Sequence, residues 1–379
     1  QTLAANIAEV QALRAICYWY LLDLFGRVPI LTSSHASMSD VKQSERNEVF
    51  DFVESELLKA CIFIPGGNSA HTGESYGRVT LSVAYFVLAK LMLNAEVYTG
   101  TPRWEDCIEF CDHISELGYT LEPNYATNFS VHNEISNENI WVIPMNRELY
   151  RNQQQNIIRS LHYRHANIYG YGGENGTCAT PHVMEIFGYG TDAKDKRLAL
   201  NYWTDVVEDP IYGLATDRTG SPLVYYPMAV DMDISGSPYV ETAGARMKKY
   251  EIDKNAVEGG KLMENDIVLF RYADVLLMRA EAKFRCGQDG QDDFDAVRER
   301  VEMDTRPISL QNLLDERLLE LCWEGWRRQD LIRFNQYESL FQGDFFSEKV
   351  NESDGHTCLF PIPAAAIALN QNLKQNKGY

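Results

Sequence analysis

A row of carboxylates near the end of the chain has a spacing that could support acid–base chemistry. Glu316, Glu320 and Glu324 recur every four residues, and paired carboxylates hydrolyse glycosidic bonds when one donates a proton and the other acts as nucleophile or base. The same spacing places all three on one face of a helix, where arginines three or four residues away form ion pairs with them. We therefore interpret the row as an ion-pair ladder on a packed helix, with Arg317, Arg327, Arg328, Asp330 and Arg333 as its other members. We interpret the cluster of Asp274, Arg279 and Glu281 in the same way.

Two motifs carry part of a metal site. Cys107 and Cys111 lie one helical turn apart with His113 nearby, but a fourth ligand is missing, so the thiols fit small buried residues of one helix face better. The segment Asp231–Gly236 begins like a calcium-binding loop, yet Thr242 stands where the bidentate Glu is required. We interpret it as a solvated turn.

A pair of histidines could also hold a metal. His162 and His165 are three residues apart, but Arg159 and Arg164 beside them disfavour a cation. The sequence has no phosphate loop, no dinucleotide fingerprint, no His-Glu-x-x-His pair and no Gly-x-Ser-x-Gly elbow. We expect no catalytic residue, no metal and no cofactor.

The aromatic residues indicate binding more than catalysis. The chain has 21 Tyr, 16 Phe and 6 Trp, and aromatic side chains with polar tips suit surfaces that are half wet. The apolar faces of sugar rings lie flat on such side chains, although peptide ligands use similar residues. Trp203 is the only Trp outside the long helices and the strand expected here, and it lies amid tyrosines. The candidate ligand-binding residues are Trp203, Tyr225, Tyr226, Tyr239, Tyr212 and Tyr169.

Composition and charge narrow the class of protein. The 379 residues are 45% hydrophobic and 23% charged, with a net charge of −19, which argues against a nucleic-acid or anionic-lipid surface. The longest apolar run, 82–98, contains Lys90, Asn94 and Glu96, so we expect a buried helix and no membrane span. Eight scattered cysteines are too few for a disulfide scaffold.

Helical periodicity dominates both ends of the chain. Apolar residues recur at helical spacing in 6–25, 44–63, 78–98, 104–117, 266–284, 292–302 and 309–334. The pair 78–117 resembles a tetratricopeptide hairpin. We expect a mainly α fold of such helix pairs, with an N-terminal helical part at 1–120 and a C-terminal one at 262–379.

The middle of the chain, 121–261, has a different character. It is rich in Gly, Pro, Asn and aromatic residues and shows little sustained periodicity. We expect a strand at 140–143 and short helices at 180–187 and 195–203. Loops held on a rigid scaffold are where binding usually occurs, so this insertion is the candidate ligand-binding subdomain.

The last twenty residues are polar but are expected to be ordered. The segment 360–379 holds prolines, which remove amide donors, and asparagines and a glycine, which favour turns, so we expect the tail to be ordered only by docking on the body.

Four blocks together resemble the SusD/RagB family. They are the tail itself, Phe270-Arg-Tyr-Ala-Asp-Val-Leu-Leu-Met-Arg-Ala-Glu-Ala282, the run from Asp315 to Arg333, and Leu13-Arg-Ala followed by Tyr18 and Phe25-Gly-Arg-Val-Pro29. Members of this family are surface lipoproteins that bind nutrients on the outer membrane of certain Gram-negative bacteria. They usually begin with a signal peptide, a lipid-bearing Cys and further helices, whereas this chain starts almost at the Leu13 block. We expect it to lack that N-terminal region and its lipid anchor.

The resemblance implies a SusD-like α/α fold and a function. The expected function is non-catalytic binding of oligosaccharides at the cell surface for delivery to a TonB-dependent outer-membrane transporter of the SusC type. Nucleic acid is not an expected partner, and contact with the membrane is expected only through the lipid anchor. The alternatives are oligopeptide binding on the same scaffold, a protein-interaction scaffold and a glycoside hydrolase.

Overall fold

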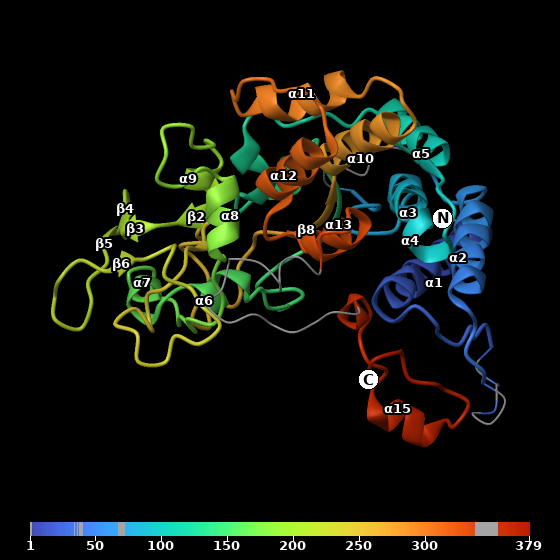
Figure 1. Cartoon of the computed structure of the whole chain (residues 1–379), viewed down its shortest axis with the longest axis horizontal. Helices are drawn as coiled ribbons and strands as arrows, with labels where there is room; N and C mark the ends of the chain where they lie inside the picture. The colour runs from blue at the N-terminus through green and yellow to red at the C-terminus, as the bar shows by residue number, and fades with distance from the viewer. Residues whose placement is uncertain (1, 34, 36, 38–40, 67–72, 338–354) are drawn as a thin grey trace.

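The computed structural model describes residues 2–33, 35, 37, 41–66, 73–337 and 355–379. These residues form a mainly helical fold with short two-stranded sheets, which confirms the expected fold class. Within them, no helix combines the length and the apolar character needed to cross a membrane. Figure 1 shows the long helices gathered on one side of the molecule and the loop-rich insertion on the other.

The N-terminal helices form as predicted, with one break. α1 packs against α2 and α3 against α5, and α2 begins at a capping box between Glu45 and Glu48. The helix expected at 78–98 is divided at Asn94, whose Nδ2 donates to the Lys90 carbonyl (2.9 Å) and competes with the helical hydrogen bonds. The helices are α1 (Leu3–Phe25), α2 (Arg46–Cys61), α3 (Leu81–Leu93), α4 (Ala95–Thr99) and α5 (Trp104–Glu116).

The first helix presents its small residues to the core. Ala8, Ala12 and Ala15 are buried, whereas Ile7 is 58% and Val10 67% exposed. Small side chains allow a close approach between packed helices, so α1 lies flat against the body and leaves larger apolar residues outside.

The C-terminal helices are α10 (Tyr272–Arg285), α11 (Gln291–Arg300), α12 (Leu310–Leu321), α13 (Arg327–Arg333) and α15 (Ala364–Leu369). The helix predicted at 266–284 is wrong in its first turns. Ile267–Arg271 is instead strand β8, because its backbone pairs antiparallel with the distant strand β1 (Asn139–Ile143). The helix predicted to run through 309–334 is interrupted where Trp323 (φ 66°) and Gly325 (φ 87°) adopt left-handed backbone conformations.

The insertion is built from short elements, as expected. β1 confirms the strand predicted at 140–143, and α8 confirms the helix predicted at 180–187. The helix predicted at 195–203 is partly wrong, because its last two residues form β2 opposite β7. The helices are α6 (Asn156–Ser160), α7 (Tyr163–Asn167), α8 (Pro181–Ile186) and α9 (Leu198–Asn201), with 3-10 turns at Tyr125–Phe129, Asn133–Ile135 and, after the insertion, His356–Cys358. The strands are β2 (Tyr202–Trp203), β3 (Asp205–Val206), β4 (Glu208–Asp209), β5 (Gly213–Leu214), β6 (Val224–Tyr225) and β7 (Arg246–Met247).

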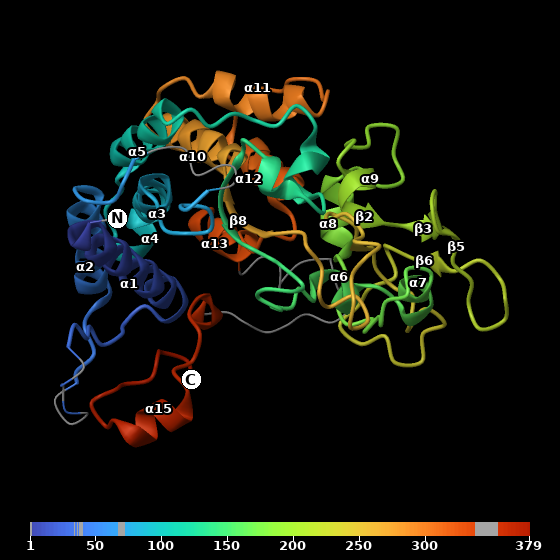
Figure 2. The same ribbon diagram turned by 180° about the vertical axis from the view of Figure 1, so that it is seen from behind.

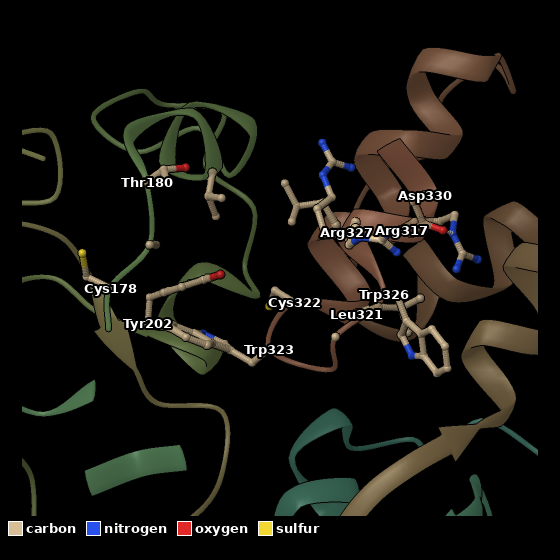
Figure 3. Close-up of a pocket in the computed structure, with 15 residues that line it drawn as sticks. Cys178, Thr180, Tyr202, Arg317, Leu321, Cys322, Trp323, Trp326, Arg327 and Asp330 are labelled. Atoms are coloured by element: carbon tan, nitrogen blue, oxygen red, sulfur yellow. Dashed lines mark ion pairs between the residues drawn. The ribbon is translucent and has the colours of Figure 1, made fainter. Parts of the chain in front are cut away.

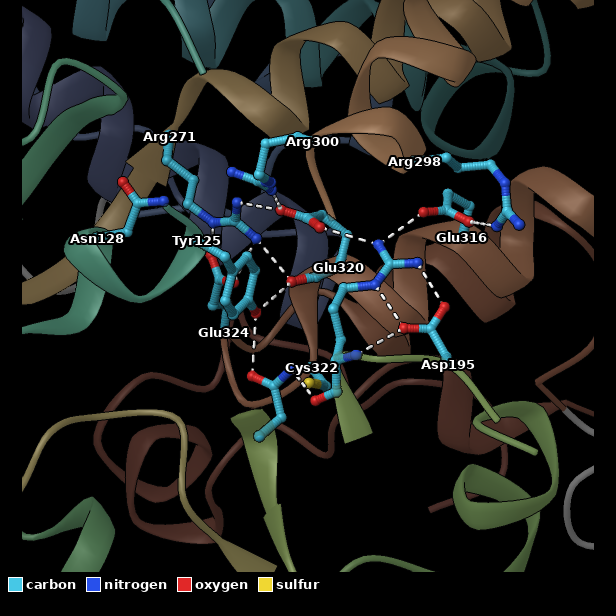
Figure 4. Close-up of polar contacts among 12 residues, drawn as sticks. Tyr125, Asn128, Asp195, Arg271, Arg298, Arg300, Glu316, Glu320, Cys322 and Glu324 are labelled. Atoms are coloured by element: carbon cyan, nitrogen blue, oxygen red, sulfur yellow. Dashed lines mark hydrogen bonds and ion pairs between the residues drawn. The ribbon is translucent and has the colours of Figure 1, made fainter. Parts of the chain in front are cut away.

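Glu316 and Glu320 on α12 are fully buried, and Glu324 follows in the turn after the helix; all three carboxylates take their partners from other elements. Figure 4 shows Arg271 and Arg300 reaching Glu320, with Asp195 and Arg298 on the far side of the cluster. The predicted ladder is therefore wrong for the partners of the three glutamates, because their carboxylates point inward, where neighbours on the same helix cannot reach them. It is right for Asp330, which pairs with Arg317 and Arg333. The ion pairs are Glu316 with Arg197, Arg298 and Arg306, Glu320 with Arg197, Arg271 and Arg300, and Glu324 with Arg271 and Lys249.

The second predicted acidic cluster is also resolved into contacts between elements. Its members do not pair with one another in the ion pairs of the described residues. The ion pairs are Asp274 with Lys90 and Arg317, Glu281 with Arg333 and Arg285, and Arg279 with Asp293 and Asp112.

The C-terminal tail docks on the segment that follows α1, which confirms the prediction that it is ordered. Figures 1 and 2 both show it beneath α1. Asn370 and Asn376 are buried. The Asn370 amide donates to the Val41 carbonyl (2.9 Å), and the Asn376 amide donates to the carbonyls of Phe25 (3.0 Å) and Phe360 (2.9 Å). Side-chain amides thus hold the tail in place on both sides of its short helix α15.

Candidate functional site

Two small antiparallel ribbons place aromatic residues at the centre of the insertion. β2 pairs with β7, opposing Trp203 to Arg246, and β3 pairs with β6, opposing Asp205 to Tyr225. Aromatic residues from both ribbons pack into one apolar core within the insertion. This core holds the loops in fixed positions.

His165 lies at the centre of this core in a chain of hydrogen bonds. The His162 amide donates to the Tyr225 hydroxyl (3.0 Å), which contacts His165 Nδ1 (3.0 Å). His165 Nε2 contacts the Tyr169 hydroxyl (3.1 Å), which donates to Asp209 (3.1 Å). Because Tyr169 gives its proton to a carboxylate, the network assigns the His165 proton to Nε2.

The pKa values of the residues in this hydrogen-bond network favour a structural role for His165. Burial lowers the pKa of His165 to about 3 and raises the pKa of Tyr225 to about 12; burial also raises the pKa of Tyr169. A general base must have a pKa near the working pH, so His165 stays neutral and positions the tyrosines.

Trp203 is less accessible than its place in a loop-rich segment suggested. It is 7% exposed, with the His165 ring centroid 4.9 Å from its own in an edge-to-face arrangement and Lys248 Nζ 4.2 Å from its ring centroid. The expectation that it lies outside any strand is wrong, since it ends β2. Burial lowers the pKa of Lys248, which Asp209 partly offsets.

Trp203 nevertheless contributes to the wall of a cleft, here called cleft A. The cleft has a volume of about 560 Å³, and its lining includes Trp203, Tyr212, His132, Lys248 and Glu251. Apolar walls with a few convergent polar groups are typical of small-molecule sites. No motif or periodicity pointed to His132, which comes from a distant part of the insertion.

The other predicted tyrosines meet at a second concavity, cleft B, of about 340 Å³. Tyr226 and Tyr239 are 39% and 37% exposed, and their ring centroids are 4.2 Å apart with planes inclined by 39°. Tyr189 and Asp205, which sequence reasoning missed, line the same cleft and are joined by a hydrogen bond of 2.6 Å. Tyr225 also contributes to its lining.

The six predicted residues are therefore divided among three environments. Trp203 and Tyr212 line cleft A; Tyr225, Tyr226 and Tyr239 line cleft B. Tyr169 is buried between them and packs edge to face on Tyr212, with ring centroids 5.0 Å apart. Only some of them can touch a ligand directly, and the others hold those in place.

The metal motifs do not come together into a site. Across the part of the chain that the structure describes, no group of three or more His, Cys, Asp or Glu side chains could hold a metal ion. Cys107 and Cys111 are buried in the main core, and His162 faces Glu241 at 3.5 Å. The segment 231–236 is a turn in which Asp233 accepts from the Ser235 amide.

Comparisons with known proteins found a matching family model and several relatives. The model of the SusD family matches residues 132–379. The starch-binding protein SusD of Bacteroides thetaiotaomicron is 27% identical over 98% of this chain and 72% of its own length. SusD-like protein P25 of Formosa agariphila is 24% identical over 98% of this chain and 73% of its own length.

Solved structures of similar fold were also found. A SusD homologue from Bacteroides thetaiotaomicron superposes with a TM-score of 0.76 at 22% identity, covering 99% of this chain and 79% of its own. Surface glycan-binding protein A from the same organism, in complex with laminarihexaose, gives a TM-score of 0.75 at 20% identity, covering 98% and 78%.

Proposed function

The chain belongs to the SusD family, and from this premise we propose that it is a non-catalytic protein that binds glycans. The names of two similar proteins support the proposal, since one is a starch-binding protein and the other was solved with laminarihexaose. The observation in this chain that carries it furthest is the exposed pair Tyr226 and Tyr239 in cleft B, beside the polar pair Tyr189 and Asp205.

The geometry of cleft B suits a sugar ring. An exposed aromatic face takes the apolar C–H face of the ring, while a carboxylate and a phenol at the edge take hydrogen bonds from its hydroxyls. Tyr212 supplies a similar face in cleft A. Trp203, Tyr225 and Tyr169 support these residues from the core, so we assign glycan contact to Tyr226, Tyr239 and Tyr212.

The carboxylates of the acidic row do not suit a glycoside hydrolase. A retaining or inverting glycosidase needs two carboxyl groups open to the substrate, but Glu316 and Glu320 are fully buried and paired with arginines. Incubation with maltohexaose and laminarihexaose should release no shorter sugars; appearance of products by chromatography would contradict the proposal.

The glycan site can be tested by calorimetry with a panel that includes those two hexasaccharides. Tyr226→Ala and Tyr239→Ala should each weaken binding by about 1–3 kcal/mol, the range for truncated aromatic anchors. Tyr163→Ala is the matched control, because Tyr163 is 46% exposed in the same insertion and lines neither cleft. Parent-like binding by both cleft B variants would place the site elsewhere. Binding of oligopeptides in place of every glycan would favour the peptide alternative.

The wider role is proposed from the family alone. We infer delivery of the glycan to a TonB-dependent transporter of the SusC type at the cell surface, with a lipid anchor holding the protein there. Co-purification of the full-length protein with such a transporter from detergent-solubilised outer membranes would support this, and recovery in a transporter-free soluble fraction would oppose it.

A further inference from the structure

A third cavity lies outside the insertion clefts, between α8 and the junction of α12 and α13. It has a volume of about 440 Å³ and shares no lining residue with cleft A or cleft B. Figure 3 shows Thr180 and Tyr202 on one wall, Arg317 and Arg327 on the other, and Trp323 at the base. Its size is within the range of small-molecule sites.

One cation of this cavity lacks an acidic partner. Arg327 donates from Nη1 to the Leu314 carbonyl (2.7 Å), but no carboxylate of the described residues lies within ion-pair distance of it. Burial lowers the pKa of Arg327, and Asp330 and Asp315 offset this only partly. Other buried arginines such as Arg197 have their pKa raised by adjacent carboxylates.

Unsatisfied donors accompany this cation. Arg317 is fully buried and ion-paired through Nη1 and Nε, yet its Nη2 has no hydrogen-bond partner within the described residues. The same holds for the indole Nε1 of Trp323. Buried donors without acceptors cost stability unless a bound group satisfies them.

The cavity offers few acceptors in return. Its one lining carboxylate among the described residues, Asp330, already forms ion pairs with Arg317 and Arg333. Its remaining walls are apolar and aromatic, with Val183, Leu318 and Tyr202 among them. The cavity is therefore rich in donors and positive charge on an apolar, aromatic base, in a protein whose net charge of −19 repels anions in general.

We propose that this cavity is a second ligand site that takes a sugar acid, a single ring bearing a carboxylate. The carboxylate lies against Arg327 and the free Nη2 of Arg317, because guanidinium groups bind carboxylates through paired hydrogen bonds. The ring lies on the aromatic base, with its hydroxyls toward Thr180. The site goes beyond the proposed function, since it is separate from both glycan clefts.

The test uses D-glucuronate as probe, with D-glucose and acetate as matched controls for the ring and for the charge. Binding is followed by calorimetry and by tryptophan fluorescence, because Trp323 and Trp326 line the cavity. Glucuronate should bind at least about tenfold more tightly than either control, a difference near 1.4 kcal/mol. Equal binding of glucose would overturn the role of the arginines, and equal binding of acetate would overturn the role of the ring.

Three variants locate the site. Arg327→Gln should weaken glucuronate binding at least about tenfold, whereas Arg327→Lys, which keeps the charge, should lose less. Val183→Phe fills the cavity without touching an arginine and should also abolish binding, so the test holds even if the Arg327 variants fold poorly. Parent-like binding by Val183→Phe would overturn the proposal. Tyr226→Ala should leave glucuronate binding unchanged, which separates failure of this site from failure of the glycan clefts.

Discussion

Glu320 is the residue whose replacement should destabilise the fold most clearly. It is fully buried and pairs with Arg271 (2.5 Å), Arg197 (2.9 Å) and Arg300. Burial alone would raise the pKa of Glu320, but the three arginines together lower it below its usual value. The carboxylate is therefore ionised in the folded protein, and removing its charge leaves buried cations with less compensation.

The magnitude follows from what the arginines retain. Breaking a buried ion pair from one side costs about 3–5 kcal/mol. Arg271 keeps Glu138 and Glu324, while Arg197 keeps Asp195 and Glu316. We therefore expect Glu320→Gln, which preserves the shape, to lower the free energy of unfolding by about 3 kcal/mol, the lower end of that range.

Urea denaturation followed by circular dichroism measures the change, with linear extrapolation of the free energy of unfolding. Glu241→Gln is the matched control, because the Glu241 side chain is 47% exposed and pairs with the exposed Arg218 at 3.3 Å and with His162 at 3.5 Å. It should change stability by less than about 1 kcal/mol. A loss below about 1 kcal/mol for Glu320→Gln would refute the argument that the network holds the fold together. Arg327, which was predicted to belong to the same ladder, is expected to behave differently because it pairs with no carboxylate of the described residues.

Three further outcomes are expected. The free energy of unfolding should decrease as pH falls from about 6.5 toward about 3, because unfolded His165 binds a proton that the folded residue, with its pKa lowered to about 3, does not. His165→Gln should flatten that part of a profile of stability against pH. An unchanged slope would show that other groups cause the decrease. Trp203→Ala should destabilise the protein by about 3–5 kcal/mol, so its melting temperature must be measured before any loss of glycan binding is interpreted. A parent-like melting temperature would mean that the ring packs less closely than its burial indicates. Asn376→Ala should cost about 1–3 kcal/mol, because two carbonyls lose a buried donor; thermal denaturation that matches the parent would show that the tail contributes nothing to stability.

The long helices were predictable because their signals are local. The segment predicted at 104–117 is helical at Trp104–Glu116, and Ser309 caps the start of α12 by accepting from the Asn312 amide. β8 was missed because Ile267–Arg271 continues the apolar pattern of α10. Only its distant partner, β1, distinguishes a strand from a first helical turn.

The candidate sites were predictable in residue type and not in exposure. Tyr226 and Tyr239 do form an exposed pair, whereas Trp203 is covered by Lys248 and His165. That cover depends on contacts between segments about 40 residues apart, which single-sequence patterns do not contain. The partners of Glu320 were unpredictable for the same reason.

The docked tail has a consequence for how the molecule opens. Its amides bind backbone carbonyls of the segment after α1, and Gln43 returns the contact by accepting from the Lys374 amide (2.9 Å). Within the described residues, the segment after α1 has a single bridge, between Val28 and Ser44, and the one α-helix of the tail, α15, has six residues, none of them buried. Such short elements do not stay folded alone when the other segment leaves. The two should therefore exchange their amide hydrogens as one cooperative unit, with equal opening free energies below that of the helical core.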